Sequence, residues 1–304
     1  MRLSIVIVNW NTRELILRCL TSIYTHAPDF EFEVWVVDNH SSDDSAANIQ
    51  TRFPQVHLIE NNENLGFATA NNQAIREASG VYIMLLNPDT EVLSNAIEEL
   101  VQFMESSPQA GAAGPLISNP DGTLQSSCFP FPTLSNEFWR LFHLDGLWPL
   151  AHYPIAAWDR QQSREVEVLL GACILLRRDA LEQVDLLDES FYMYSEEIDL
   201  CYRLMKTGWT IHWIPQASII HLGGQSTLQA QAQMFMHLYE SKLHFFRKHY
   251  GHRPTETYKI VLVLASLARI GIGRVLGYFP GRFSEKYRTI TERYQSLLRA
   301  LPHL

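Results

Sequence analysis

VYIMLLNPD, at residues 81–89, is an apolar run that ends in polar residues. Apolar runs and amphipathic stretches alternate along roughly the first hundred residues, with apolar runs at 3–8, 33–37 and 56–59 and amphipathic stretches at 13–26, 43–53, 68–78 and 95–104. This alternation predicts an α/β fold with a parallel, doubly wound sheet flanked by helices. Ligands of such sheets lie beyond the carboxyl ends of the strands. Those ends carry Asn9, Asp38 and Asp89, so the sequence predicts a polar ligand site there.

A second acidic segment follows about a hundred residues later, where residues 195–201 read SEEIDLC at the start of a predicted helix. A divalent cation that holds a diphosphate prefers oxygen ligands, and a hydroxyl that must become a nucleophile needs a nearby base. The two acidic segments therefore predict transfer chemistry on a phosphate-activated substrate. Acidic residues also favour the first turn of any helix, so a purely structural interpretation of this segment stays open.

Composition restricts the class of protein. The 304 residues are 46% hydrophobic and 19% charged, which suffices for a large core. A net charge of −9 argues against nucleic acid as the partner. Cys19, Cys128, Cys173 and Cys201 have neither disulfide-like nor zinc-like spacing, which is typical of a reducing compartment. The apolar residues 3–8 are too few for a signal peptide, so we expect a buried first strand and a cytoplasmic protein.

The middle of the chain, residues 119–165, interrupts this regularity with several prolines and aromatic residues. It predicts an excursion near the active site, and a surface insertion packed by its own aromatic residues is the alternative. A strand is expected at 166–176, and short strands at 210–214 and 218–221.

The C-terminal part predicts two helices, at 229–250 and at 258–278. Arg269 and Arg274 disfavour a helix that spans a bilayer. After Tyr258 the basic residues are Lys259, Arg269, Arg274, Arg282, Lys286, Arg288, Arg293 and Arg299, and the acidic ones are Glu285 and Glu292. A basic tail on an acidic protein predicts contact with an anionic membrane surface. A helix docked on the core with solvated arginines is the alternative.

Seven segments form a pattern: SIVIVNWN at 4–11, VVDNHSSD at 36–43, NNENLGFA at 61–68, LLNPDT at 85–90, GAC at 171–173, YSEEIDL at 194–200 and HLGG at 221–224. Their order and spacing resemble the inverting family 2 glycosyltransferases of the GT-A fold, in particular the rhamnosyltransferase-like branch. The resemblance covers roughly residues 3–250. It implies a Rossmann-like, mostly parallel central sheet flanked by helices, with a C-terminal helical extension. The implied catalytic domain is 1–250, with a nucleotide-sugar half at about 1–118 and an acceptor half at about 119–250, followed by a basic amphipathic tail at 251–304.

The resemblance assigns the donor site. Asp38 corresponds to the residue that hydrogen-bonds the nucleotide base, and a carboxylate suits a pyrimidine N–H because it accepts when ionised. Asp89 corresponds to the ligand of Mg²⁺ or Mn²⁺ in the D-x-D signature. Asn87 replaces the first Asp of that signature and brings no charge to a metal. The nucleotide-sugar-binding residues are then Asn9, Asn11, Asp38, Asn64, Gly66, Asn87 and Asp89.

The resemblance also assigns the acceptor side. Glu197 corresponds to the general base. The family usually has Asp at this position, and the Glu side chain is one methylene longer. Glu196 and Asp199 are expected to orient the acceptor or to close the start of the helix. Gly171 and Ala172 would let the sugar approach the backbone closely. His221, with Gly223 and Gly224 after it, corresponds to an element that contacts the diphosphate or the metal.

The implied reaction transfers rhamnose from dTDP-rhamnose to a saccharide acceptor, free or linked to polyprenyl diphosphate, in bacterial cell-surface polysaccharide assembly. A UDP-hexose donor stays open, as does a non-catalytic relative that only binds sugar nucleotides, because Asn87 and Glu197 depart from the family pattern. Residues 9–12 contain no G-x-G-x-x-G motif, which excludes a nicotinamide-dependent oxidoreductase. They contain no glycine-rich phosphate loop either, which excludes a nucleotidyltransferase. The expected location is cytoplasmic, peripheral at the inner face of the cell membrane.

Overall fold

A computed structural model describes residues 1–148, 150–224, 229–277 and 282–304. The chain forms two compact units. An α/β unit comprises Met1–Phe131 and Tyr153–Gln229, and a helical unit comprises Pro132–His152 and Ala230–Leu304.

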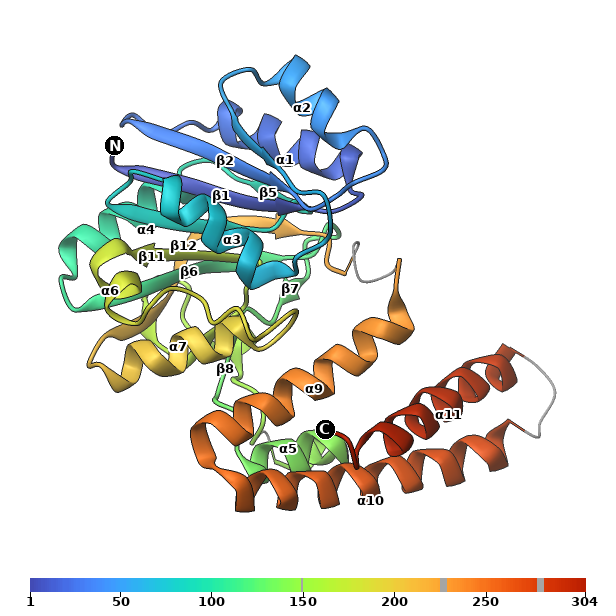
Figure 1. The fold of residues 1–304 in the computed structure, drawn as a ribbon. Coiled ribbons are helices and arrows are strands. Elements are labelled where there is room, and N and C mark those ends of the chain that lie inside the picture. Colours follow the sequence, from blue (N-terminus) through green and yellow to red (C-terminus); the bar gives the residue numbers. More distant parts are fainter. Residues whose placement is uncertain (149, 225–228, 278–281) are drawn as a thin grey trace. The chain divides into compact units, whose positions relative to one another are not determined.

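The α/β unit contains a mixed sheet with the strand order β3-β2-β1-β4-β11-β6-β12-β5 (Figure 1). The strands along this order are β3 (His57–Glu60), β2 (Phe32–Asp38), β1 (Leu3–Asn9), β4 (Tyr82–Leu86), β11 (Cys173–Arg177), β6 (Ala110–Ser118), β12 (Thr210–His221) and β5 (Thr90–Val92). Off this path, β7 (Leu124–Gln125) pairs with β6, and β9 (Arg164–Glu165) pairs with β12. A separate antiparallel pair joins β8 (Cys128–Phe129) to β10 (Val168–Leu169).

The strands β3, β2, β1 and β4 are mutually parallel, which confirms the predicted α/β fold with parallel strands. The strand β11 runs antiparallel to both of its neighbours, β4 and β6. This pairing sets Cys173 opposite Leu86, so β11 begins where β4 ends. The residues just before Cys173 and just after Leu86 therefore lie at the same edge of the sheet.

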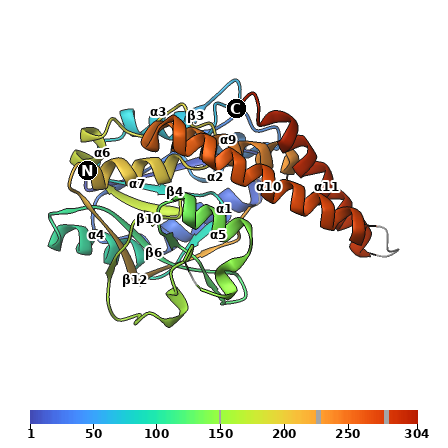
Figure 2. The same ribbon diagram turned by 90° about the horizontal axis from the view of Figure 1, so that it is seen from below.

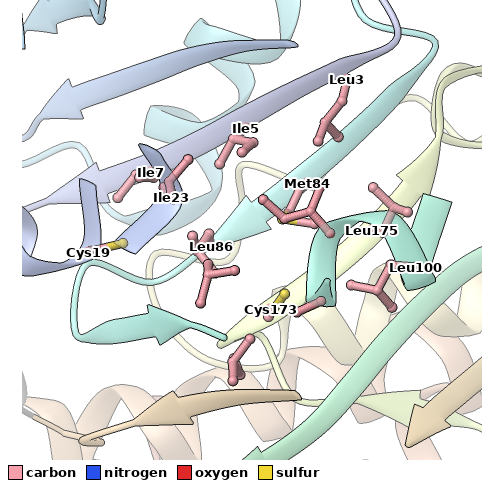
Figure 3. Packing of buried hydrophobic residues seen from close by; sticks show 14 of the residues in the cluster. Leu3, Ile5, Ile7, Cys19, Ile23, Met84, Leu86, Leu100, Cys173 and Leu175 are labelled. Atoms are coloured by element: carbon pink, nitrogen blue, oxygen red, sulfur yellow. The ribbon is translucent and has the colours of Figure 1, made fainter. Parts of the chain in front are cut away.

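Helices cover both faces of this sheet. On one face lie α1 (Arg13–Thr25), α2 (Ser45–Arg52) and α4 (Ala96–Ser106), and on the other α3 (Phe67–Glu77), α6 (Arg178–Gln183) and α7 (Glu196–Lys206). Successive strand residues point to opposite faces. Ile5 and Ile7 therefore join the cluster that contains Ile23 of α1 (Figure 3), while Val6 joins the cluster that contains Leu200 of α7. Burial of one such side chain contributes about 1.5–3 kcal/mol, so the sheet is a stable platform for its edge loops.

The helical unit comprises α5 (Leu134–Leu141), the 3₁₀ helix η1 (Leu144–Gly146), α9 (Gln231–Tyr250), α10 (His252–Leu276) and α11 (Arg282–Ala300). Figures 1 and 2 show α10 and α11 side by side. Within the described parts of the chain, no helix is long and apolar enough to cross a membrane. Of the helix expected at 258–278, Tyr278 lies outside the described residues.

A buried carboxylate ties the segment 132–152 to the C-terminal helices. Glu137 accepts hydrogen bonds from Lys242 Nζ at 2.7 Å and from Tyr258 Oη at 2.8 Å, and it also pairs with Arg140. Burial alone would raise the pKa of Glu137, but Lys242 and Arg140 lower it to about 2. The expected excursion at 119–165 is therefore divided between the two units. The helical unit begins again at Ala230 and contains both α9 and α10, so its boundary differs from the one predicted at residue 250. The predicted division into functional domains stays a prediction.

Gly66, which precedes α3, fixes the loop at 61–68 against the segment before α7. Its φ is 83°, and a Cβ at this position would lie 2.5 Å from the carbonyl oxygen of Tyr192. The same carbonyl accepts the Phe67 N–H at 2.9 Å. Both the backbone conformation and the close contact therefore require glycine.

We expect Gly66→Ala to lower the free energy of unfolding by about 2 kcal/mol or more, because the left-handed φ and the contact with Tyr192 both penalise a methyl group. Gly122→Ala is the control, since Gly122 has a φ of 81° with nothing within 4 Å of a Cβ. It should cost about 1 kcal/mol. Chemical denaturation measures both, and equal losses would contradict the packing role of Gly66.

Candidate active site

The carboxylate of Asp38 is held at the end of β2 by its neighbours. Asn9 Nδ2 donates to Asp38 Oδ1 at 2.8 Å, and the Ser41 N–H donates to Asp38 Oδ2 at 2.9 Å. Asn9 is oriented in turn by the Thr12 hydroxyl, which donates to Asn9 Oδ1 at 2.7 Å. A carboxylate has about four acceptor positions, so two remain for other donors. The structure thus brings Asn9 and Asp38 together, in the register that pairs β1 with β2.

Asn11 lies in the loop after β1 with a left-handed φ of 51°. Its side-chain oxygen accepts the Ser42 N–H at 2.7 Å, and its own N–H donates to Ser41 Oγ at 2.9 Å. These bonds join the loops after β1 and β2. Asn11 therefore shapes the same corner as Asp38.

Asn39, the polar residue that follows Asp38 at the end of β2, organises the next loop. Its side-chain nitrogen donates to Asn64 Oδ1 at 2.9 Å and to Gly66 O at 3.1 Å, and its oxygen accepts from Asn61 Nδ2 at 3.1 Å. Asn64 Oδ1 also accepts the Gly66 N–H at 3.0 Å. The predicted residues Asn64 and Gly66 therefore lie in one hydrogen-bonded loop with Asn39, whose signal in the sequence was its place directly after Asp38.

Asp89 and His221 form a buried pair beyond the end of β4. Thr90 of β5 pairs with His221 of β12, and the Leu222 N–H donates to Asp89 O at 3.0 Å. This backbone pairing sets Asp89 Oδ1 3.3 Å from His221 Nε2. The imidazole is fixed from its other side, where His221 Nδ1 lies 2.7 Å from Gln125 Oε1.

The Asp89 and His221 pair fits one divalent cation. Two atoms that each lie about 2.1 Å from a metal are about 3 to 3.4 Å apart at octahedral to tetrahedral angles. His221 Nε2 is buried and has no hydrogen-bond partner among the described residues. In that part of the chain no group of three His, Cys, Asp or Glu side chains gathers as a metal cage. A cation held by Asp89 and His221 would therefore take its other ligands from phosphate oxygens and water, as Mg²⁺ does.

Glu197 is connected to this pair through the start of β11. The Asn87 N–H donates to the carbonyl oxygen of Ala172 at 2.9 Å. A Cβ on Gly171 would lie 3.8–3.9 Å from Cβ, Cγ and Cδ of Glu197, so the Glu197 side chain lies over Gly171. The antiparallel strand β11 thus brings the predicted base to the same sheet edge as Asp89.

The helix that carries Glu197 begins after two left-handed residues, Tyr194 with a φ of 68° and Ser195 with a φ of 66°. Non-glycine residues in this conformation are uncommon and concentrate at functional sites. They turn the chain so that α7 starts at the sheet edge. Its first turn therefore presents Glu197 beside Gly171.

Glu196 and Asp199 are more deeply buried than Glu197. Asp199 accepts from Arg203 Nε at 2.6 Å and is inaccessible to solvent, so it serves an ion pair within α7. Burial and the neighbouring Glu197 raise the pKa of Glu196 well above its ordinary value. The structure places both residues beside the site, and their expected contact with the acceptor stays a prediction.

Glu196→Gln tests the burial of this carboxyl group. Because the folded-state pKa is raised, the folded protein keeps the proton longer than the unfolded chain, so Glu196 lowers stability as the pH rises above about 4.3. The variant should gain stability over the wild type progressively with pH. Thermal unfolding between about pH 4 and pH 8 measures this, with the exposed Glu77→Gln on α3 as the control. A gain that does not change with pH would contradict the raised pKa.

Comparison with known proteins places the chain in a family. The pattern of glycosyl transferase family 2 matches residues 4–185. The chain belongs to this family and is a nucleotide-sugar-dependent glycosyltransferase. It is 31% identical over 239 residues to an N-acetylglucosaminyl-diphospho-decaprenol L-rhamnosyltransferase of Mycobacterium tuberculosis, which covers 74% of this chain and 77% of the relative. It is 25% identical over 224 residues to the rhamnosyltransferase WbbL of Escherichia coli, covering 71% and 82%.

A solved structure shares the fold. The mannosyltransferase PcManGT of Pyrobaculum calidifontis, solved in complex with GDP-Man and Mn²⁺, aligns with a TM-score of 0.58 and 18% identity over 98% of this chain and 85% of its own. At this identity the likeness supports the GT-A-like architecture alone. The predicted fold and the predicted family are therefore both confirmed.

Proposed function

We propose that this chain transfers rhamnose from dTDP-rhamnose to a saccharide carried on a polyprenyl diphosphate, with inversion at the anomeric carbon. The observation that carries the proposal is that β11 begins where β4 ends, so that Gly171, with Glu197 over it, lies at the same edge of the sheet as the Asp89–His221 pair. The donor and acceptor classes come from the rhamnosyltransferase relatives, one of which is named for a diphospho-decaprenol substrate.

Each group of residues has one task in the proposed reaction. Asp38 accepts a hydrogen bond from the base of the donor, and Asn9 keeps that carboxylate oriented. Asp89 and His221 would hold Mg²⁺ or Mn²⁺, and the cation would supply charge stabilisation for the diphosphate leaving group. Glu197 accepts the proton of the acceptor hydroxyl as its oxygen bonds to the anomeric carbon and the bond from that carbon to the diphosphate oxygen breaks. Gly171 leaves room for the sugar because it has no side chain.

Two isosteric variants separate these tasks. Glu197→Gln should lower kcat by about 10²- to 10⁴-fold with donor affinity nearly unchanged, because a positioned base acts only on the chemical step. Asp89→Asn should lower kcat at least as much and also weaken Mn²⁺-dependent donor binding. Release of dTDP with dTDP-rhamnose, acceptor and Mn²⁺ measures the rate, and calorimetry measures the affinity.

Glu77→Gln, on the exposed side of α3, serves as the control and should retain full activity. Near-normal transfer by both site variants would refute the assignment. Binding of donor by the wild type without any release of nucleoside diphosphate would instead favour a non-catalytic sugar-nucleotide-binding relative.

The donor is identified by a panel of sugar nucleotides in thermal unfolding with Mn²⁺. A ligand at 100 times its Kd stabilises the folded protein by about 2.7 kcal/mol, so a true donor gives a clear shift. We expect dTDP-rhamnose to give the largest shift. A larger shift with a UDP-hexose would transfer the proposal to that donor.

We further propose that α10 lies on an anionic bilayer, where a polyprenyl-linked acceptor resides. One face of α10 exposes Ile260, Leu264 and Leu267 at more than half of their surface, at the spacing of an amphipathic helix. Val275 continues this apolar face, and the excess of basic residues after Tyr258 suits anionic lipid headgroups.

The double variant Leu264→Ser, Leu267→Ser should weaken sedimentation with vesicles of phosphatidylglycerol and phosphatidylcholine by at least about tenfold, because each leucine loses apolar burial in the bilayer. Val81→Ser removes an exposed apolar residue of the α/β unit and should change nothing. Unchanged vesicle binding, or loss of a dimer in the absence of vesicles, would show that this face has another occupant.

A further inference from the structure

The hairpin between β6 and β7 contains a chain of hydrogen bonds that ends on His221. The Thr123 hydroxyl donates to Asp121 Oδ1 at 2.6 Å, and Asn119 Nδ2 donates to Thr123 Oγ1 at 2.9 Å. Gln125 Nε2 donates to Asn119 Oδ1 at 3.1 Å, and Gln125 Oε1 lies 2.7 Å from His221 Nδ1. Four side chains of one hairpin thus form a relay to an imidazole about a hundred residues away in the sequence.

The carboxylate of Asp121 fixes the direction of the whole relay. An ionised carboxylate can only accept, so the Thr123 proton must lie toward Asp121, and Thr123 Oγ1 must accept from Asn119. The Asn119 amide is then oriented with its oxygen toward Gln125. This orientation requires the Gln125 nitrogen to donate to it.

Gln125 consequently presents its oxygen to the imidazole. An amide oxygen only accepts, so His221 Nδ1 must carry a proton. In a neutral imidazole the lone pair is then on Nε2. Nε2 lies 3.3 Å from Asp89 Oδ1, which is an acceptor as well. When the imidazole is neutral, two buried acceptors thus face each other, and a cation between them would satisfy both.

We infer that the Asn119–Gln125 hairpin sets the tautomer of His221, with Gln125 as a positioning residue that keeps Nε2 available to the cation. This inference rests on the proposed cation at Asp89 and His221. Groups that orient a ligating histidine through its other nitrogen typically raise metal affinity by 10- to 100-fold. The Gln125 side chain thus bridges Asn119 in the hairpin and the imidazole of His221.

The test uses the full chain with two measurements that do not depend on turnover. Electron paramagnetic resonance gives the affinity for Mn²⁺ in the presence of saturating dTDP. Long-range ¹⁵N–¹H correlation of labelled histidine gives the tautomer of His221 without metal at about pH 9, where a free imidazole is neutral. The variants are Gln125→Leu, Thr123→Val, His221→Ala and Asp89→Asn, and the exposed Ser126→Ala is the matched control in the same segment.

Wild type and Ser126→Ala should show the Nδ1–H tautomer and equal Mn²⁺ affinity. Gln125→Leu should weaken Mn²⁺ binding by about 10- to 100-fold and populate the Nε2–H tautomer. Thr123→Val, which is isosteric and exposed, should shift both readouts less in the same direction, which guards against a folding defect in the Leu variant.

If Gln125→Leu and Thr123→Val change neither readout while His221→Ala weakens Mn²⁺ binding, the relay is refuted and the cation site stands. If His221→Ala and Asp89→Asn both leave Mn²⁺ binding unchanged, the cation site is refuted, and the inference about Gln125 falls with it.

Discussion

The candidate active site of this glycosyltransferase depends on the antiparallel pairing of β11 with β4. Parallel strands bring their carboxyl ends to one edge of a sheet, so β1, β2 and β4 supply Asn9, Asp38 and Asp89 by the usual rule. An antiparallel strand contributes its amino end to that same edge. The pairing of Cys173 with Leu86, continued by the bond from Asn87 to Ala172, brings Gly171 and the overlying Glu197 to the edge of the sheet where β4 ends.

Around this edge, polar groups are held by hydrogen bonds to one another. Asp38 is held by Asn9 and Ser41, the loop with Gly66 is held by Asn39, and His221 is held by Gln125. Such networks keep side chains in one geometry, so these side chains lose little further conformational entropy when a ligand binds. The burial of Glu196 beside Glu197 lowers stability when Glu196 is ionised, since a buried carboxylate with a like charge nearby is unfavourable.

The sequence was sufficient to predict the parallel strands of the sheet and the family of the protein. The alternating apolar runs predict strands, and residues such as Asp89 and Glu197 belong to segments whose joint spacing is specific. It could not reveal the direction of β11, because apolar periodicity is the same for a parallel and an antiparallel strand. The contact of Gln125 with His221 was not predicted, because a single amide gains its role from partners far away in the chain.

The sequence did not predict that residues 132–152 belong to the helical unit, for a similar reason. Prolines and aromatic residues suggested one excursion near the site, but the burial of Glu137 against Lys242 assigns this segment to the helical unit. Ion pairs between residues 105 positions apart leave no local pattern. The same holds for the apolar face of α10, whose exposure depends on which neighbours pack around it.

The most direct test of the central claim is a crystal structure with Mn²⁺ and dTDP-rhamnose, in which anomalous scattering locates the metal independently of the protein. The account predicts one manganese peak about 2 Å from both Asp89 and His221 Nε2, with the Glu197 carboxylate on the side of the anomeric carbon opposite the diphosphate. A metal bound elsewhere, or a Glu197 side chain that faces away from the sugar, would contradict it.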